Sequence, residues 1–172
     1  YGTPALDANP KKDPYLYELG RQLTMGSQTG NRCELDFLYD KDNFYLYAYC
    51  SDAEIRLDEP IDKDGLFFWL DVRGLSDTHP QEGIFKFFFG ADGTISMRRG
   101  LNNKWQAEEF NPEGLKVEKK VGKTYYIMEI AIPWTLLGET QAPTDGREMR
   151  LNVQLRDRRE KKLLLEKIPD TT

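Results

Sequence analysis

The stretch CELDFLYDKDNFYLYAYCSD, residues 33–52, predicts a β-hairpin together with its register. Its polar centre, residues 40–43, has the Asp and Asn content of a tight turn. A two-residue loop and a four-residue loop at this point give the same register, in which Cys33 lies opposite Cys50. Because side chains alternate along a strand, one face of the hairpin is then apolar and the other carries carboxylates and tyrosines.

The apolar face of this hairpin is predicted to be a core face. Its opposed pairs are Cys33–Cys50, Leu35–Ala48, Phe37–Leu46 and Tyr39–Phe44. The pairs on the other face are Glu34–Tyr49, Asp36–Tyr47 and Leu38–Tyr45. Tyrosines at period two either form the floor of a binding surface or lie beneath another part of the chain, and both interpretations remain open.

The two cysteines of the chain oppose each other in this register. If the protein is exported, a cross-strand disulfide can form and persist. The alternative is a pair of buried thiols, because buried cysteine is common and paired strand positions often have poor disulfide geometry.

The rest of the chain indicates further short strands separated by turns. Residues 66–71 and 84–89 are apolar on both faces, which predicts central strands covered on both sides. Residues 94–99 return beside 84–89, residues 124–132 end at Pro133, residues 133–138 suggest one helical turn, and residues 163–168 suggest a last strand. With about eight to ten strands and little helix, we predict an all-β protein, an antiparallel β-sandwich of jelly-roll or immunoglobulin-like type. We expect residues 1–172 to form a single domain.

Composition excludes several classes of function. The net charge is −5 with both signs spread along the chain, so we expect no nucleic-acid partner. No apolar run is long enough to cross a membrane. One histidine, and no nucleophile motif, Cys/His metal spacing or phosphate loop, argue against an enzyme.

Three segments in this order resemble the family 9 carbohydrate-binding modules and the wider DOMON-like β-sandwich superfamily. They are FLYDKDNFYL at residues 37–46, DGLFFWLD at 64–71, and MEIAIPW at 128–134 followed by LNVQLRD at 151–157. The resemblance implies a non-catalytic module of a larger secreted polysaccharide-acting protein. The expected partners are an oligo- or polysaccharide and other domains of that protein, and the expected location is extracellular, periplasmic or at the cell surface.

The resemblance also implies a sugar site that is altered here. Family members clamp a glycan between two tryptophans, whose positions match residues 61–63 and 163–165 of this chain, where no aromatic residue stands. A family glutamate matches Phe67, and a family basic residue matches Lys86.

Sugar binding needs aromatic faces for stacking and planar polar groups for hydroxyls. The candidate aromatic platform is the tyrosine stripe Tyr45, Tyr47 and Tyr49, or else Trp105 in a polar loop. Trp69 and Trp134 are assigned to the core. The candidate polar ligands are Lys86, Arg98, Arg150, Asn152, Gln154 and Arg156.

Structural calcium, which family members commonly hold, makes the acidic loops candidate metal sites. Hard oxygen ligands must converge for Ca²⁺, and the candidates are Asp40, Asp42, Asp52 and Asp64. The alternative for the hairpin tip is ordinary turn chemistry. No organic cofactor is expected.

Two other functions remain open. One is a structural or protein-docking sandwich domain with a degenerate sugar site. The other is a haem-binding DOMON-like domain, with His79 and a methionine (Met25, Met97, Met128 or Met149) as axial ligands.

Overall fold

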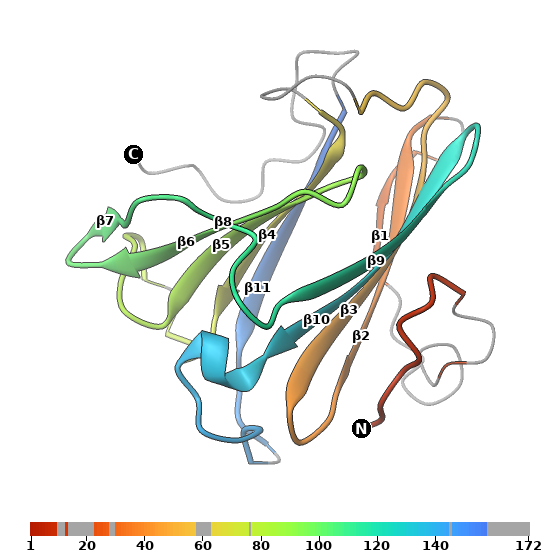
Figure 1. The fold of residues 1–172 in the computed structure, drawn as a ribbon. Coiled ribbons are helices and arrows are strands. Elements are labelled where there is room, and N and C mark those ends of the chain that lie inside the picture. Colours follow the sequence, from red (N-terminus) through yellow and green to blue (C-terminus); the bar gives the residue numbers. More distant parts are fainter. Residues whose placement is uncertain are drawn as a thin grey trace.

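Two antiparallel sheets face each other in the computed structural model (Figure 1), which describes residues 1–9, 13, 23–27, 30–57, 63–75, 77–144 and 146–157. The first, sheet A, has the strand order β1-β2-β3-β10-β9. Its strands are β1 (Leu23–Gly26), β2 (Arg32–Tyr39), β3 (Asn43–Ser51), β10 (Tyr125–Pro133) and β9 (Lys116–Val121).

The second sheet, sheet B, has the order β11-β4-β5-β6-β7, with β8 pairing β6. Its strands are β11 (Arg150–Arg156), β4 (Gly65–Asp71), β5 (Ile84–Gly90), β6 (Ile95–Leu101), β7 (Lys104–Trp105) and β8 (Glu109–Phe110). A 3-10 helix, η3 (Trp134–Leu137), follows β10. The predicted antiparallel β-sandwich with little helix is confirmed. The proposed last strand at 163–168 lies outside the described residues.

The predicted hairpin register is confirmed at every pair. Strands β2 and β3 pair from Arg32 opposite Ser51 to Tyr39 opposite Phe44, with Cys33 opposite Cys50. The turn is closed by Asp40, whose backbone N–H donates to the Asn43 carbonyl at 3.0 Å.

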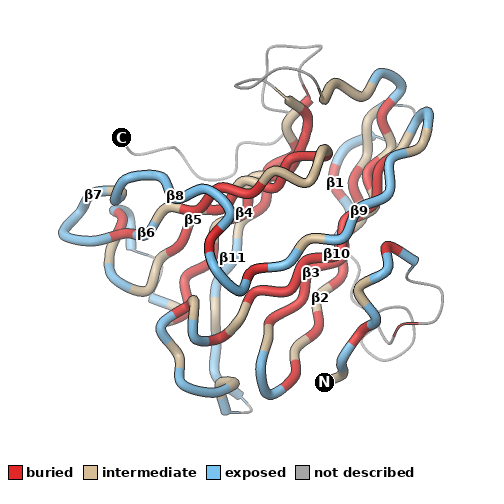
Figure 2. Tube along the Cα trace, in the orientation of Figure 1, coloured by how far each residue is buried: buried red, intermediate tan, exposed pale blue. Residues whose placement is uncertain are grey.

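The main core lies between the two sheets, where Figure 2 shows the facing strands mostly buried. Sheet B contributes Leu66, Phe68 and Leu70 from β4, and the phenylalanine rings at alternate positions of β5. Phe68 stacks against Phe44 of sheet A with centroids 6.2 Å apart, so aromatic contacts join the sheets.

The end of β10 is tied to the tip of the hairpin. Trp134 donates its Nε1–H to the Asp40 carbonyl at 2.9 Å, and its backbone N–H bonds the Asp42 carbonyl at 3.0 Å. The helical turn then stops at Gly138, whose φ of 80° is a left-handed conformation that glycine adopts without strain. The predicted helical turn, and the core position of Trp134, are confirmed.

A second, smaller hydrophobic cluster covers the outer face of sheet A. Its buried members are Ala8, Leu38, Tyr45, Tyr47, Ile127 and Ala131. The N-terminal segment lies beside this face in Figure 1, and its Gly2 N–H bonds the Tyr39 carbonyl at 2.9 Å. In the described part of the chain, no helix has the length and apolar character needed to span a membrane.

Glu129 anchors the N-terminal segment to sheet A. This fully buried carboxylate accepts hydrogen bonds from the backbone N–H groups of Asp7 and Ala8, at 2.8 and 2.7 Å. Burial, reinforced by the Asp13 carboxylate, raises the pKa of Glu129 to about 7. Burial likewise raises the pKa of Asp36 to about 6.

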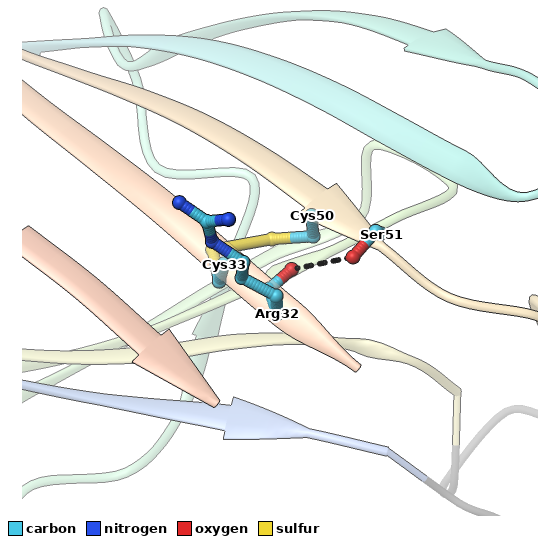
Figure 3. Close-up of a disulfide and its surroundings, with 4 residues drawn as sticks. All are labelled: Arg32, Cys33, Cys50 and Ser51. Atoms are coloured by element: carbon cyan, nitrogen blue, oxygen red, sulfur yellow. Dashed lines mark hydrogen bonds between the residues drawn. A yellow bond between two sulfur atoms is a disulfide. The ribbon is translucent and has the colours of Figure 1, made fainter. Parts of the chain in front are cut away.

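Cys33 and Cys50 form a disulfide across β2 and β3 (Figure 3). Both cysteines are fully buried on the core face. Beside the bridge, the Ser51 hydroxyl donates to the Arg32 carbonyl at 3.4 Å. The structure therefore has the disulfide, and not the alternative pair of buried thiols.

We expect replacement of both cysteines by alanine to lower the free energy of unfolding by about 2–4 kcal/mol, because the bridge restricts the unfolded chain. Urea unfolding of parent and variant under oxidising conditions measures this difference. A reductant should shift the parent towards the variant, while leaving the variant unchanged. Equal stability of the two proteins without reductant would contradict the disulfide.

We expect the fold to become less stable as the pH rises from about 4 to about 7. Carboxyls with raised pKa values keep their protons in the folded state where the unfolded chain has lost them, so the stability is lost between the ordinary carboxyl pKa and the folded values of about 6 and 7. Thermal unfolding across this range measures the slope. Glu129→Gln should flatten it, whereas Glu118→Gln, at the exposed neighbouring position on β9, should not. An unchanged slope in Glu129→Gln would show that Glu129 does not titrate there.

Candidate functional site

A groove with a volume of about 360 Å³ lies on the outer face of sheet B. Residues from β4, β5, β6, β8 and β11 line it, together with Lys63 before β4 and Glu108 before β8. Its aromatic lining includes Phe67, Phe88 and Phe110, and its basic lining includes Lys86, Arg98 and Arg156.

Strand alternation aims these side chains outwards. In β4 the buried positions Leu66, Phe68 and Leu70 alternate with the half-buried positions Phe67 and Trp69. The expectation that residues 66–71 and 84–89 are covered on both faces, with Trp69 in the core, is therefore wrong, because Lys86 and Phe88 of β5 are likewise half-buried and line the groove. A strand that carries aromatic rings on both faces has the same sequence pattern whether its second face packs against protein or lines a groove.

Cross-strand pairing assembles the outward residues into two rows. One row runs from Gln154 through Phe67, Phe88 and Ser96 to Phe110. The adjacent row runs from Asn152 through Trp69 and Lys86 to Arg98. Opposed residues on one face of a sheet are close neighbours, so the rows form a continuous surface of rings flanked by polar groups.

Two cations lie against the aromatic rings. The Lys86 ammonium is 5.3 Å from the ring centroid of Phe67 and 5.0 Å from that of Trp69. The Arg156 guanidinium is 5.7 Å from the centroids of Phe67 and Phe88. Cation–π contact at these distances orients both charged groups over the groove floor.

The acidic group beside the groove is already engaged. Arg98 bonds the Glu108 carboxylate at 3.1 Å. Burial would raise the pKa of Glu108, but hydrogen bonds from Ser96 and Arg98, and the charges of Arg98 and Lys86, lower it. Glu108 is therefore held as an anion within a basic surface.

The structure brings five of the predicted polar residues onto this one face of sheet B. Lys86, Arg98 and Arg156 line the groove, and Gln154 and Asn152 lie in the rows beside it. Gln154 is buried against Phe67, whereas Asn152 is partly exposed opposite Trp69.

The predicted aromatic platforms lie elsewhere. Tyr45 and Tyr47 are buried on the outer face of sheet A, and Tyr49 is half-buried and stacks on Tyr125 with centroids 5.6 Å apart. This is the alternative in which the tyrosine stripe lies beneath another part of the chain. Trp105, half-buried on β7 opposite Gly100, is not among the residues lining the groove.

Sequence reasoning missed four aromatic residues at this face: Phe67, Trp69, Phe88 and Phe110. The alternation of β11, with polar residues at 152, 154 and 156, was the available signal, because its partner β4 must aim 67 and 69 to the same side. Phe110, which is 64% exposed, comes from a short strand with no such pattern.

Three buried carboxylates meet at one end of the sandwich. Oxygen atoms of Asp52, Asp64 and Asp157 all lie within 4.8 Å of one another. Asp52 accepts from the Glu54 N–H at 2.8 Å, Asp64 accepts from the Arg56 N–H at 2.7 Å, and Asn31 donates to Asp157. The chain thus gathers two of the predicted metal ligands, Asp52 and Asp64, and adds Asp157.

A buried tyrosine hydroxyl belongs to the same cluster. Tyr126 is fully buried, and its hydroxyl oxygen has no hydrogen-bond partner among the described residues. Burial and then the charges of Asp64, Asp52 and Asp157 raise its pKa well above the ordinary value. Hard oxygens that converge in this way, with one still lacking a partner, fit a calcium ion.

Asp40 and Asp42 are not part of that cluster. Asp40 closes its own turn, accepting from the N–H groups of Asp42 and Asn43 at 2.8 and 2.9 Å, and from the Tyr45 hydroxyl at 2.7 Å. The exposed Asp42 lies at the hairpin tip. Turn chemistry therefore accounts for Asp40.

The structure adds no support to the haem alternative. His79 is exposed in the loop before β5, with its Nδ1 2.9 Å from the Thr78 hydroxyl. Met25, Met97 and Met128 are packed in the main core.

Two solved structures share this fold, and both are family 9 carbohydrate-binding modules from Caldicellulosiruptor kristjanssonii. The complex with cellotriose has a TM-score of 0.66 and 13% identity over 90% of this chain and 73% of that one. The complex with glucose has a TM-score of 0.65 and 13% identity over 90% and 74% of the two chains. No curated protein matches the sequence.

These likenesses show that the chain shares the β-sandwich fold of these modules. The sequence model described as "Carbohydrate family 9 binding domain-like" matches residues 17–168. The chain therefore belongs to this family, as the resemblance implied.

Proposed function

We propose that this chain binds glycan in the groove on the outer face of sheet B, by stacking and hydrogen bonding and without breaking a bond. The observation that carries the proposal is the meeting of Phe67, Phe88 and Phe110 with Lys86 and Arg156 in one groove. Aromatic rings offer area to the C–H faces of sugars, and planar polar groups orient the hydroxyls. The structural relatives in complex with cellotriose and glucose support a sugar as the ligand.

The chemistry of the groove favours binding over hydrolysis. Glycoside hydrolysis ordinarily uses two carboxyl groups flanking the scissile bond. Among the described residues that line the groove, Glu108 is the one acid, and Arg98 holds it as an anion. This chemistry suits a non-catalytic module attached to a larger polysaccharide-acting protein.

The disulfide supports an exported location. Cross-linked cysteines persist in oxidising compartments, whereas the cytosol keeps thiols reduced. With Cys33 bonded to Cys50, an extracellular, periplasmic or cell-surface site of action suits this chain.

We further propose that Asp52, Asp64 and Asp157 hold a structural calcium ion, with the Tyr126 hydroxyl beside it. Three carboxylates this close repel one another unless a cation or protons intervene. The cluster joins the strand ends of both sheets, since Asp52 follows β3, Asp64 precedes β4 and Asp157 follows β11. A cation here would therefore stabilise the sandwich as a whole.

We expect Phe110→Ala to weaken glycan binding about tenfold, which corresponds to about 1.4 kcal/mol of lost contact. Phe110 is suited to this test because it is exposed and its removal leaves the core intact. Titration calorimetry, with ligands first selected on a glycan array, measures the change.

Trp105→Ala is the matched control, because Trp105 lies on the neighbouring β7 outside the groove lining. Its affinity should equal that of the parent. If Trp105→Ala lost glycan binding and Phe110→Ala did not, the sugar site would lie at β7 and not in the groove. A folded protein that binds no glycan at all would favour the protein-docking function instead.

We expect calcium to raise the melting temperature by about 5–10 °C at one hundred times its dissociation constant, because the ion binds the folded state. Differential scanning fluorimetry with calcium and with a chelator measures this shift. Asp64→Asn should abolish it.

The control for the calcium site is Asp42→Asn, which removes an exposed acid at the hairpin tip. It should respond to calcium as the parent does. The absence of any shift in the parent at millimolar calcium would contradict the metal site.

A further inference from the structure

The three-carboxylate cluster and the groove share consecutive residues of the chain. Asp64 belongs to the cluster, and its neighbour Lys63 lines the groove. Asp157 also belongs to the cluster, and its neighbour Arg156, the last residue of β11, lines the groove. The two sites therefore adjoin twice, once at the start of β4 and once at the end of β11.

Strand alternation explains this arrangement. Side chains of neighbouring residues in an extended chain point to opposite sides. Asp64 and Asp157 are buried inside the sandwich, whereas Lys63 and Arg156 line the groove on its outer face. A shift of either carboxylate therefore moves the backbone that carries the adjacent groove residue.

The pairing of β4 with β11 links the two junctions to each other. The two strands run side by side in Figure 1, and Arg156 lies opposite Gly65, the residue that follows Asp64. A Cβ atom at Gly65 would lie 2.9 Å from the ring of Phe88, so the glycine leaves room for that ring. The Arg156 guanidinium lies 5.7 Å from the centroids of Phe67 and Phe88, so its place over the groove floor depends on how these strand ends are held.

The junction before β4 is also tied to the β5–β6 turn. The Asp64 carbonyl accepts a hydrogen bond from the Ala91 N–H at 2.8 Å. Lys63 bonds the Asp92 carboxylate, and the Thr94 hydroxyl at 2.9 Å. The position of Asp64 therefore affects the groove wall through Lys63 and through this turn.

The state of the carboxylate cluster determines how these strand ends are held. Oxygen atoms of its three carboxylates lie within 4.8 Å of one another, so the groups repel when all are ionised. A shared cation offsets this repulsion and draws the carboxylates together. Without the cation, we expect the ends of β4 and β11 to move apart and to carry the adjoining groove residues with them.

We infer that Asp64 and Asp157 are positioning residues of the glycan groove, which fix the places of Lys63 and Arg156 when the cluster holds its cation. Glycan affinity then depends on calcium. This inference rests on the proposed function, because it names how that same groove is regulated, and on the proposed calcium site. Linkage makes the effect reciprocal, so glycan must raise the affinity for calcium by the factor that calcium adds to glycan affinity.

The experiment measures both affinities on the same protein. Titration calorimetry with cellotriose, xylotriose and maltotriose, in millimolar calcium and in chelator, gives the glycan affinities. Calcium titrations with and without a saturating amount of the bound trisaccharide give the calcium affinities. We expect calcium to tighten the binding of at least one trisaccharide about fivefold or more, and that trisaccharide to tighten calcium binding by the same factor.

Two groove variants distinguish positioning from general stabilisation. Arg156→Met removes the guanidinium that Asp157 positions, so it should lower glycan affinity in calcium and reduce the calcium factor. Phe110→Ala removes a ring carried by β8, which pairs with β6 on the opposite side of the groove from β11. It should lower the affinity equally with and without calcium and leave the calcium factor unchanged.

Two carboxylate variants test the cluster itself. Asp64→Asn should bind glycan as the parent does in chelator, and should show no response to calcium. Asp42→Asn, which changes an exposed acid at the hairpin tip, should respond as the parent does. Thermal unfolding in each buffer shows whether the protein is folded at the temperature of the titration.

The outcomes separate this inference from the proposed function. Equal glycan affinity in calcium and in chelator, or a parent that binds no calcium, would overturn this inference and leave glycan binding in place. The same calcium factor in the parent and in Arg156→Met would show that the ion acts only on the fold as a whole, and would overturn the positioning role. A folded protein that binds neither these trisaccharides nor any member of a glycan array in calcium would overturn the proposed function as well.

Discussion

Side-chain alternation along paired strands is the constraint on which this structure depends. Once Cys33 is paired with Cys50, every residue of β2 and β3 is assigned to the inside or the outside of the sandwich. The same rule in β4 buries Phe68 and turns Phe67 outwards, although both are phenylalanine. Register, and not residue type, therefore separates core rings from groove rings.

The outer faces of the two sheets differ in the side chains that they present. Sheet A presents tyrosines and buried carboxylates, and the N-terminal segment covers them by donating backbone N–H groups to Glu129. Sheet B presents rings flanked by Lys86 and Arg156, whose charged heads lie over the ring of Phe67.

Part of the site follows from sequence pattern, and part does not. The polar positions 152, 154 and 156 follow from alternation in β11, and their placement on one face with Lys86 and Arg98 is what the structure has. Phe67 and Trp69 were not assigned, because the alternation of β11 places them only once β11 is known to pair with β4, and an apolar outward position by itself is equally consistent with a covered strand. The tyrosine stripe was predicted as an aromatic platform for sugar. That prediction could not be tested from the local pattern, which does not reveal what packs on the tyrosines.

The sequence by itself determined the hairpin, its register and the opposed cysteines, because turn chemistry and period-two alternation act between near neighbours. Only the tertiary structure decided which outer face the N-terminal segment covers and which acids come together. Asp7 reaches Glu129 across 122 positions, and Asp52 and Asp64, at the two ends of the β3–β4 connection, meet Asp157 after β11. Contacts at such separations depend on how the two sheets stack, and local patterns carry no information about that packing.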